Sequence, residues 1–137
     1  MFEQELFNYI SANFAATLPL AWNNVTIHFG EAEESTKTPY IVMYPLNNDG
    51  TKQVLCNEND YTDGETSIQF NIYTVNYSNS LYIGRQLDIF LSKIDILENY
   101  RVLLNNHEVA RGFPDLNTGL SLETVTRRFT YNKKGDN

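Results

Sequence analysis

The stretch from Thr66 to Ile94 changes its hydrophobic period in the middle, and this change constrains the fold more than any other feature of the chain. Its first part alternates polar residues with Ile68, Phe70 and Ile72, a period of two that places one apolar face on a strand. Its second part has the apolar stripe of an amphipathic helix, at Leu81, Ile83, Leu87, Phe90, Leu91 and Ile94. A helix that folds back over its own strand needs a sheet to cover, so the other strands are expected to complete that sheet.

Residues 76–80, Asn-Tyr-Ser-Asn-Ser, separate these two parts and contain turn formers. Either Ser78 or Ser80 is predicted to cap the helix, because a serine hydroxyl can accept a hydrogen bond from a free backbone N–H of the first turn.

A first helix is predicted for residues 2–16, where large apolar residues recur every four positions and Glu3, Gln4, Asn8 and Asn13 take the other side. Pro19 ends this helix, because the residue before a proline is pushed out of the helical region. A short strand follows at residues 25–29, with His28 on the face opposite its apolar residues.

The second strand is predicted at residues 40–46, a continuous apolar run. Pro45 cannot donate a hydrogen bond to a neighbouring strand, so the strand should end there or have that position at an edge. Residues 47–65 are mostly polar and lack a clear period, which predicts a long loop; residues 52–56 are a candidate short strand within it.

In the second half, residues 100–104 are predicted to form a strand, and Asn105-Asn106 a hairpin turn, since asparagine tolerates positive φ. Residues 108–113 would return as its partner, and residues 114–119 form a loop. The last strand, residues 122–131, carries Arg127 on its apolar face and Arg128 on the opposite face.

This order of elements predicts an α+β fold: an antiparallel or mixed β-sheet with the N-terminal helix and the second amphipathic helix packed on it. At 137 residues the chain suits one domain. The expected organisation is a single domain over residues 1–131, including the long loop 47–65, and a flexible C-terminal tail over residues 132–137.

Composition excludes several classes of function. The net charge of −7 argues against sequence-independent nucleic-acid binding over a broad basic face. The single cysteine, Cys56, excludes an internal disulfide and favours a reducing compartment. Neither a secretory signal nor an apolar run near the roughly 20 residues of a membrane span is visible, so synthesis inside the cell is expected.

The residues that could perform catalysis do not form a recognisable set. His28 and His107 are the only histidines, and neither has metal-ligand spacing to the other or to Cys56. Cys56 has only Lys52 as a basic neighbour, which favours an inert thiol. Gly84 lies alone inside the second helix, and close packing against the sheet or a neighbour explains it better than phosphate binding. No catalytic, cofactor or metal site is therefore predicted.

The chain is acidic in one region. Residues 31–65 contain eight carboxylates and two lysines, a net charge of −6. The segment 57–64 does not keep the register of a calcium-binding EF-hand loop. Two interpretations of this acidic region remain. It is either a solvated acidic loop or a contact surface that is anchored by Tyr61 and includes Asp60, Asp63 and Glu65.

The opposite charge lies at the C-terminal end. Residues 127–137 carry a net charge of +3, from Arg127, Arg128, Lys133 and Lys134 against Asp136. One of the two arginines is expected to pair with an acid at the sheet edge or in an interface, and the other with solvent or a neighbouring subunit. An acidic middle and a basic end also suit head-to-tail contact between copies, which closes into a ring for the right rotation.

Several patterns together resemble the tail terminator and tail-completion (head-tail joining) proteins of long-tailed bacteriophages. These are the helix that starts near the first residue, Ile-Gln-Phe-Asn-Ile-Tyr at 68–73, the 76–80 turn, the helix 81–94, and Glu-Thr-Val-Thr-Arg-Arg-Phe-Thr-Tyr at 123–131. The resemblance covers nearly the whole chain through loose patterns, which neck and minor capsid proteins share in part.

This resemblance implies a non-enzymatic virion protein of the tail and neck region, made in the cytoplasm of the bacterial host. It would form a hexameric ring on the tail-tube protein, stop tube polymerisation, and join the head-tail connector or neck protein, while DNA crosses the lumen without specific binding. The alternatives are a neck, head-completion or minor capsid protein, or an enzyme or small-ligand-binding α+β domain with a site under the 47–65 loop.

Overall fold

The computed structural model describes residues 2–20, 22–33, 36–48, 63–108, 113–114 and 120–134. Within these ranges the chain forms helix α1 (Phe2–Asn13), the 3₁₀ turn η1 (Ala15–Thr17) and helix α3 (Tyr77–Ser92). The strands are β1 (Thr26–Phe29), β2 (Tyr40–Asn48), β3 (Asp63–Thr74), β4 (Tyr100–Glu108), β5 (Phe113–Pro114) and β6 (Ser121–Lys133). The α+β fold is as the sequence predicts.

The described strands form one mixed sheet in the order β1-β2-β3-β6-β4, and β5 pairs with β6 beyond the end of β4. The β1–β2 pair is parallel and the other pairs are antiparallel. The twelve-residue β3 and the thirteen-residue β6 form its centre, paired from Asp63↔Asn132 to Thr74↔Ser121.

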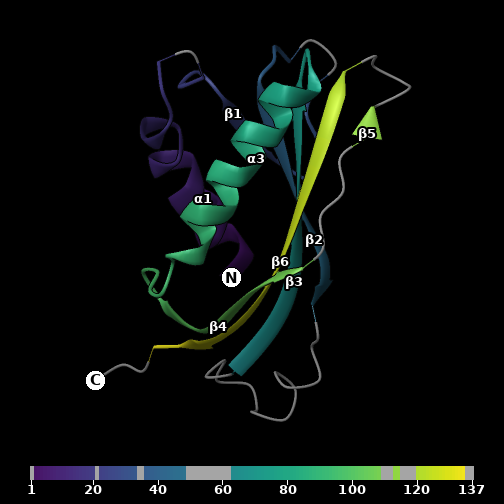
Figure 1. Ribbon diagram of the computed structural model, residues 1–137. Coiled ribbons are helices and arrows are strands. Elements are labelled where there is room, and N and C mark those ends of the chain that lie inside the picture. Colours follow the sequence, from purple (N-terminus) through teal and green to yellow (C-terminus); the bar gives the residue numbers. More distant parts are fainter. Residues whose placement is uncertain are drawn as a thin grey trace.

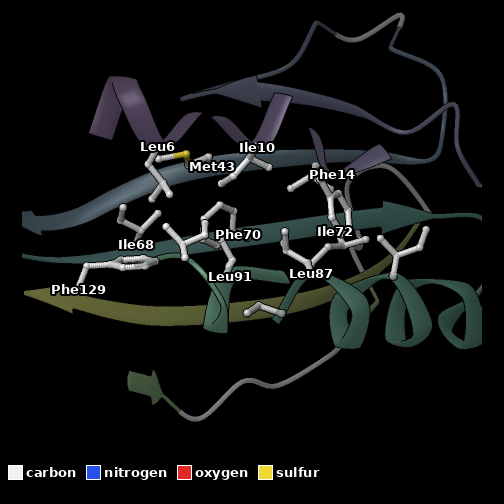
Figure 2. Packing of buried hydrophobic residues seen from close by; sticks show 14 of the residues in the cluster. Leu6, Ile10, Phe14, Met43, Ile68, Phe70, Ile72, Leu87, Leu91 and Phe129 are labelled. Carbon is white, nitrogen blue, oxygen red and sulfur yellow. The ribbon is translucent and has the colours of Figure 1, made fainter. Parts of the chain in front are cut away.

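Both helices cover the same face of the sheet, which we call the helix face (Figure 1). Side chains from α1, α3, β2, β3 and β6 meet there, including Leu6, Ile10, Met43, Phe70, Leu87 and Phe129 (Figure 2). Each large apolar side chain removed from water contributes roughly 1.5–3 kcal/mol, so this layer is the main source of stability. The Phe2 ring completes it at one end, stacked on Tyr131 with ring centroids 4.1 Å apart.

The first helix differs from its predicted pattern at Glu3. The sequence pattern places Glu3 on the polar side, but its side chain is buried, with 2% exposure. Glu3 shares a helical stripe with Phe7, Ile10 and Phe14, at spacings of four, seven and eleven residues, so the apolar face is wide enough to include it. The helix also ends at Asn13, and η1 replaces its expected last turn.

Pro45 lies inside β2, so the strand does not end there. Of the two expected environments, the structure shows the position at an edge. The β1 partner ends at Phe29, which pairs with Met43, so the edge of β2 beside Pro45 has no strand partner in the described residues. The β2–β3 register is irregular between Pro45 and Asn47. A proline is tolerated at such a position because no ladder hydrogen bond needs its missing N–H. Residues 49–62, with the candidate strand and most of the acidic loop, lie outside the described ranges.

The predicted hairpin turn at Asn105-Asn106 is wrong. The β4 strand continues through both residues to Glu108 and pairs with β6, with Asn105 opposite Phe129 and Asn106 opposite Arg128. The Asn105 side chain donates to the backbone oxygen of Leu91 at 2.7 Å, a tertiary contact that a turn would remove. The β6 strand also runs to Lys133, beyond the expected strand end at Tyr131.

The cap of α3 is Asn76, and neither of the predicted serines fills this position. The Asn76 side chain accepts from the backbone N–H of Asn79 at 3.0 Å. Ser80 is buried in the first turn, where its hydroxyl contacts Thr74 Oγ1 at 2.6 Å and donates to the Ser121 backbone oxygen at 3.0 Å. Ser80 therefore ties α3 to the ends of β3 and β6.

Candidate functional site

Arg127 is the centre of a polar cluster that joins three elements, formed by Asp88 on α3, Asn105 and His107 on β4, and Arg127 on β6. The guanidinium donates from Nη1 to Asp88 Oδ1 at 2.6 Å and from Nε to Asn105 Oδ1 at 2.5 Å. Its Nη2 donates to the Asn105 backbone oxygen at 3.1 Å. Because the Arg127 side chain is only 6% exposed, these partners replace the water that would otherwise stabilise its charge. Losing one of them would leave a buried unpaired group.

His107 extends this cluster toward solvent. Its Nδ1 lies 3.1 Å from Asp88 Oδ1, and its side chain is 48% exposed. His28, the other histidine, contacts the Thr26 hydroxyl at 3.0 Å, and its ring is perpendicular to the Tyr40 ring with centroids 6.0 Å apart. In the described part of the chain, no three His, Cys, Asp or Glu side chains are grouped as a metal site would require.

Arg128 points to the other side of the sheet, as strand alternation predicts. Its side chain is 52% exposed and forms an ion pair with Glu65 on β3. Both arginines thus have acidic partners within their own chain, and Arg128 is also half exposed to solvent; contact of either arginine with a neighbouring subunit stays a prediction.

The six residues predicted as an interface are only partly brought together. Glu65 and Arg128 meet on one face, and Arg127 lies on the other. Asp63 begins β3, opposite Asn132 on β6. Asp60 and Tyr61 lie outside the described residues. The contact of this set with another subunit stays a prediction.

Glu123 is a buried carboxyl that the sequence analysis did not single out. It has 7% exposure and lies beneath α3, where a Cβ on Gly84 would come within 2.8 Å of its Cγ. Burial raises the pKa of the Glu123 carboxyl, while a hydrogen bond from the Thr124 backbone N–H and the charge of Arg85 act in the opposite direction. The sequence signal that could have revealed this burial is strand alternation, which places Glu123 on the same face as Val125.

A shallow pocket of about 280 Å³ opens beside Glu123, between α3 and the outer side of β6. Leu81, Ile89 and Val125 give its lining an apolar part, and Arg85, Asp88 and His107 line it together with Glu123. His107 and Asp88 form a base-and-carboxylate pair, but the residues that line this pocket include no serine, threonine or cysteine to act as a nucleophile beside them.

The face of the sheet opposite the helices is polar along its centre. We call it the polar face, and it consists of four cross-strand pairs of β3 and β6: Asn71↔Thr124, Gln69↔Thr126, Ser67↔Arg128 and Glu65↔Thr130. The two charges on this face, Glu65 and Arg128, pair with each other. Amides and hydroxyls form the rest, and Asn71 and Thr126 are buried, so the accessible part of the face offers hydrogen-bonding groups with little net charge.

Comparison with known proteins identifies the fold. No protein-family model and no curated protein matches the chain. A chain of the solved virion of the native gene transfer agent (GTA) particle matches with a TM-score of 0.64 and 12% identity, over 95% of this chain and 90% of that one. A second solved structure, whose name carries no function, matches with a TM-score of 0.53 and 14% identity, over 99% and 92% of the two chains. At these identities the likeness is one of fold.

Among the described residues, no helix is both long and apolar enough to span a membrane.

Proposed function

We propose that this chain is a non-enzymatic structural protein of a phage-like virion, and specifically a tail terminator. In this role copies assemble into a ring, expected to be hexameric, that caps the tail tube, stops its polymerisation and forms the surface for joining the head. The observation that carries the proposal is the fold shared with a gene transfer agent virion chain over 95% of the present chain. The resemblance of the 68–73 and 123–131 patterns to tail terminators supports the finer assignment.

The polar face supports a lumen role within such a ring. DNA moves most freely through a lumen whose surface has little positive charge, because lysine and arginine contacts to the phosphates would bind it. The Glu65–Arg128 pair neutralises the charges of this face, and the partly exposed Ser67, Gln69 and Thr124 add only neutral polar groups. We propose that this face lines the lumen and that DNA passes it without specific binding.

The test is assembly with defined partners. The purified chain is measured by size-exclusion chromatography with light scattering, alone and with the tail-tube protein of the same particle, and the products are viewed by electron microscopy. We expect rings on tube ends and tubes that stop growing when the chain is added. A monomer at every concentration that also leaves tube growth unchanged would contradict the proposal.

A neck or head-completion role is the second candidate, because the matching virion chain is described only as part of a whole particle. Binding of the ring to the head-tail connector protein, with no effect on tube growth, would favour this candidate. In both cases the protein would belong to the virion after synthesis in the host cytoplasm.

A further inference from the structure

We propose that neighbouring copies join by pairing the β4 edge of one copy with the β1 edge of the next, so that the sheet continues around the ring. The inference rests on the proposed ring assembly and adds the surfaces that form it. The strands β4 and β1 end the order β1-β2-β3-β6-β4, so one chain carries both partners of a head-to-tail contact.

The β4 edge has the features of an edge strand that accepts a partner. In the described residues β4 pairs with β6 on one side, and its other side has a single bridge, Arg101↔Ile96, near its start. Beyond the bulge after Val102 the strand regains regular pairing from Leu104 to Glu108. Leu103 and Leu104 are 49% and 58% exposed, and β4 contains no lysine or proline to block pairing.

Strand directions allow the contact. The strands β1 and β2 run parallel, and the three following pairs alternate, so β4 runs opposite to β1. When copies are related by rotation about a ring axis, each keeps its strand direction relative to that axis. The β4 strand of one copy therefore meets β1 of the next in antiparallel orientation, which a direct backbone ladder can join.

The positions of the two edges also fit a closed sheet. Through the register, β1 lies level with residues 122–125 of β6, and the regular part of β4 lies level with residues 126–130. This offset is about 15 Å along the strands, at about 3.3 Å per residue. Across five strands about 4.8 Å apart it corresponds to a strand tilt of about 30°, near the roughly 35–45° of closed barrels.

Charge complementarity selects a second copy as the occupant of this edge. Arg101 is exposed near the start of β4, and Lys133 pairs with the adjacent Tyr100. The segment bridged to β4 here also carries the exposed acids Asp95 and Glu98, but with Lys93 and Lys134 included this end keeps a net charge of +2. Glu31 and Glu33 are exposed just after the end of β1. Antiparallel pairing directs that end of β1 toward the start of β4, so the acidic end of one copy meets the basic end of the next.

Intermolecular disulfides test the contact directly. Leu104 and Asn106 lie on the polar face, because they pair with Thr130 and Arg128 of β6. Thr26 and His28 lie on the same face, through their pairing with Tyr40 and Val42 of β2. Single cysteines at these four positions, in a chain with Cys56→Ser, are mixed in the four β4–β1 combinations and oxidised. Neighbouring antiparallel strands bring Cα atoms within about 4.5–5.5 Å, inside the range for a disulfide.

We expect at least one mixture to form cross-linked dimers, while each variant alone does not, and Asn8→Cys on the exposed side of α1 does not react with either edge. Arg101→Glu should weaken self-association about tenfold, whereas Arg85→Glu, the same charge change on α3, should have little effect.

Each failure has a separate meaning. If rings form but no mixture cross-links above the Asn8→Cys control, the edge contact is wrong and the proposed ring stands. If Asn106→Cys cross-links alone, two β4 edges meet and the head-to-tail contact is wrong. If the parent chain stays a monomer with tube protein present, both this contact and the proposed function are contradicted.

Discussion

At Gly84, α3 leaves no room for a side chain against β6. A Cβ there would lie 2.8 Å from Glu123 Cγ and 3.5 Å from Val125 Cγ2. Glycine inside a helix costs about 1 kcal/mol relative to alanine, so its presence at this position needs an explanation from packing. The close approach to Glu123 provides it, in agreement with the close packing predicted from the isolated glycine.

Gly84→Ala is predicted to destabilise the protein by about 1–2 kcal/mol, because overpacking against β6 exceeds the gain in helix propensity. Urea unfolding measures the change. The matched control is Gly84→Ala in a Glu123→Ala background, where the Cγ that collides is absent and the penalty should disappear. Equal destabilisation in both backgrounds would show that the contact with Glu123 is not the cause.

The raised pKa of Glu123 predicts a pH dependence of stability. A raised pKa means that the folded state holds the proton more tightly than the unfolded chain, so this group's contribution to stability is lost as pH rises from the ordinary value of 4.5 through the raised pKa. Glu123→Gln cannot ionise, so its stability relative to the parent chain should increase between about pH 4 and pH 7. Urea midpoints over this pH series check the prediction, with Glu98→Gln at an exposed position as the control. A constant difference would contradict it.

At the scale of elements, the Arg127 cluster fastens α3 and β4 to β6. Arg127→Met is predicted to cost about 2–4 kcal/mol, because Asp88 and the Asn105 side chain lose their shared partner in a mostly buried site. Arg128→Met removes the partly exposed pair with Glu65 and should cost about 1 kcal/mol or less. Chemical denaturation of the two variants compares them. Similar losses of stability would mean that burial does not determine how much each ion pair contributes to the free energy of unfolding.

The start of α3 gives a second prediction at this scale. Asn76→Ala should cost about 1 kcal/mol, because the backbone N–H of Asn79 loses its acceptor. Ser78→Ala, at an exposed position of the same turn, should be nearly neutral and serves as the control. Thermal unfolding of both variants distinguishes the observed cap from the serine cap that the sequence pattern favours.

At the scale of the whole molecule, the fold separates the charges along the sheet. The β1 and β2 strands bring Glu31 and Glu33 to one edge, and β6 and β4 bring Lys133 and Arg101 to the other. Glu31 and Glu33 thus lie near one edge of the sheet and Arg101 near the other, while Glu65 and Arg128 pair with each other on the two central strands. This arrangement suits assembly through unlike edges, and like edges of two copies would repel.

Ring assembly is therefore predicted to weaken with salt. Raising ionic strength from about 0.05 M to about 0.5 M shortens the Debye length to a few ångströms and screens the exposed Glu31, Glu33 and Arg101. Light scattering should show a larger dissociation constant at high salt, mainly through slower association. Assembly that strengthens with salt would indicate an apolar contact in place of the charged edges.

The sequence by itself determined the elements that have a strong local period, because such a period depends only on residues close together in the chain. The period of two at Ile68, Phe70 and Ile72 and the helical stripe after Leu81 both correspond to observed elements. The opposite directions of Arg127 and Arg128 also followed from alternation alone.

Only the tertiary structure decided which elements become neighbours, because strand pairing and side-chain partners depend on residues far apart in the chain. Asn105 has the local chemistry of a turn, yet it remains in β4, where it bonds Leu91 and Arg127. Glu3 and Glu123 are buried by packing that local polarity does not anticipate. The placement of β1 and β4 at the two edges belongs to this level too, and the proposed ring contact depends on it.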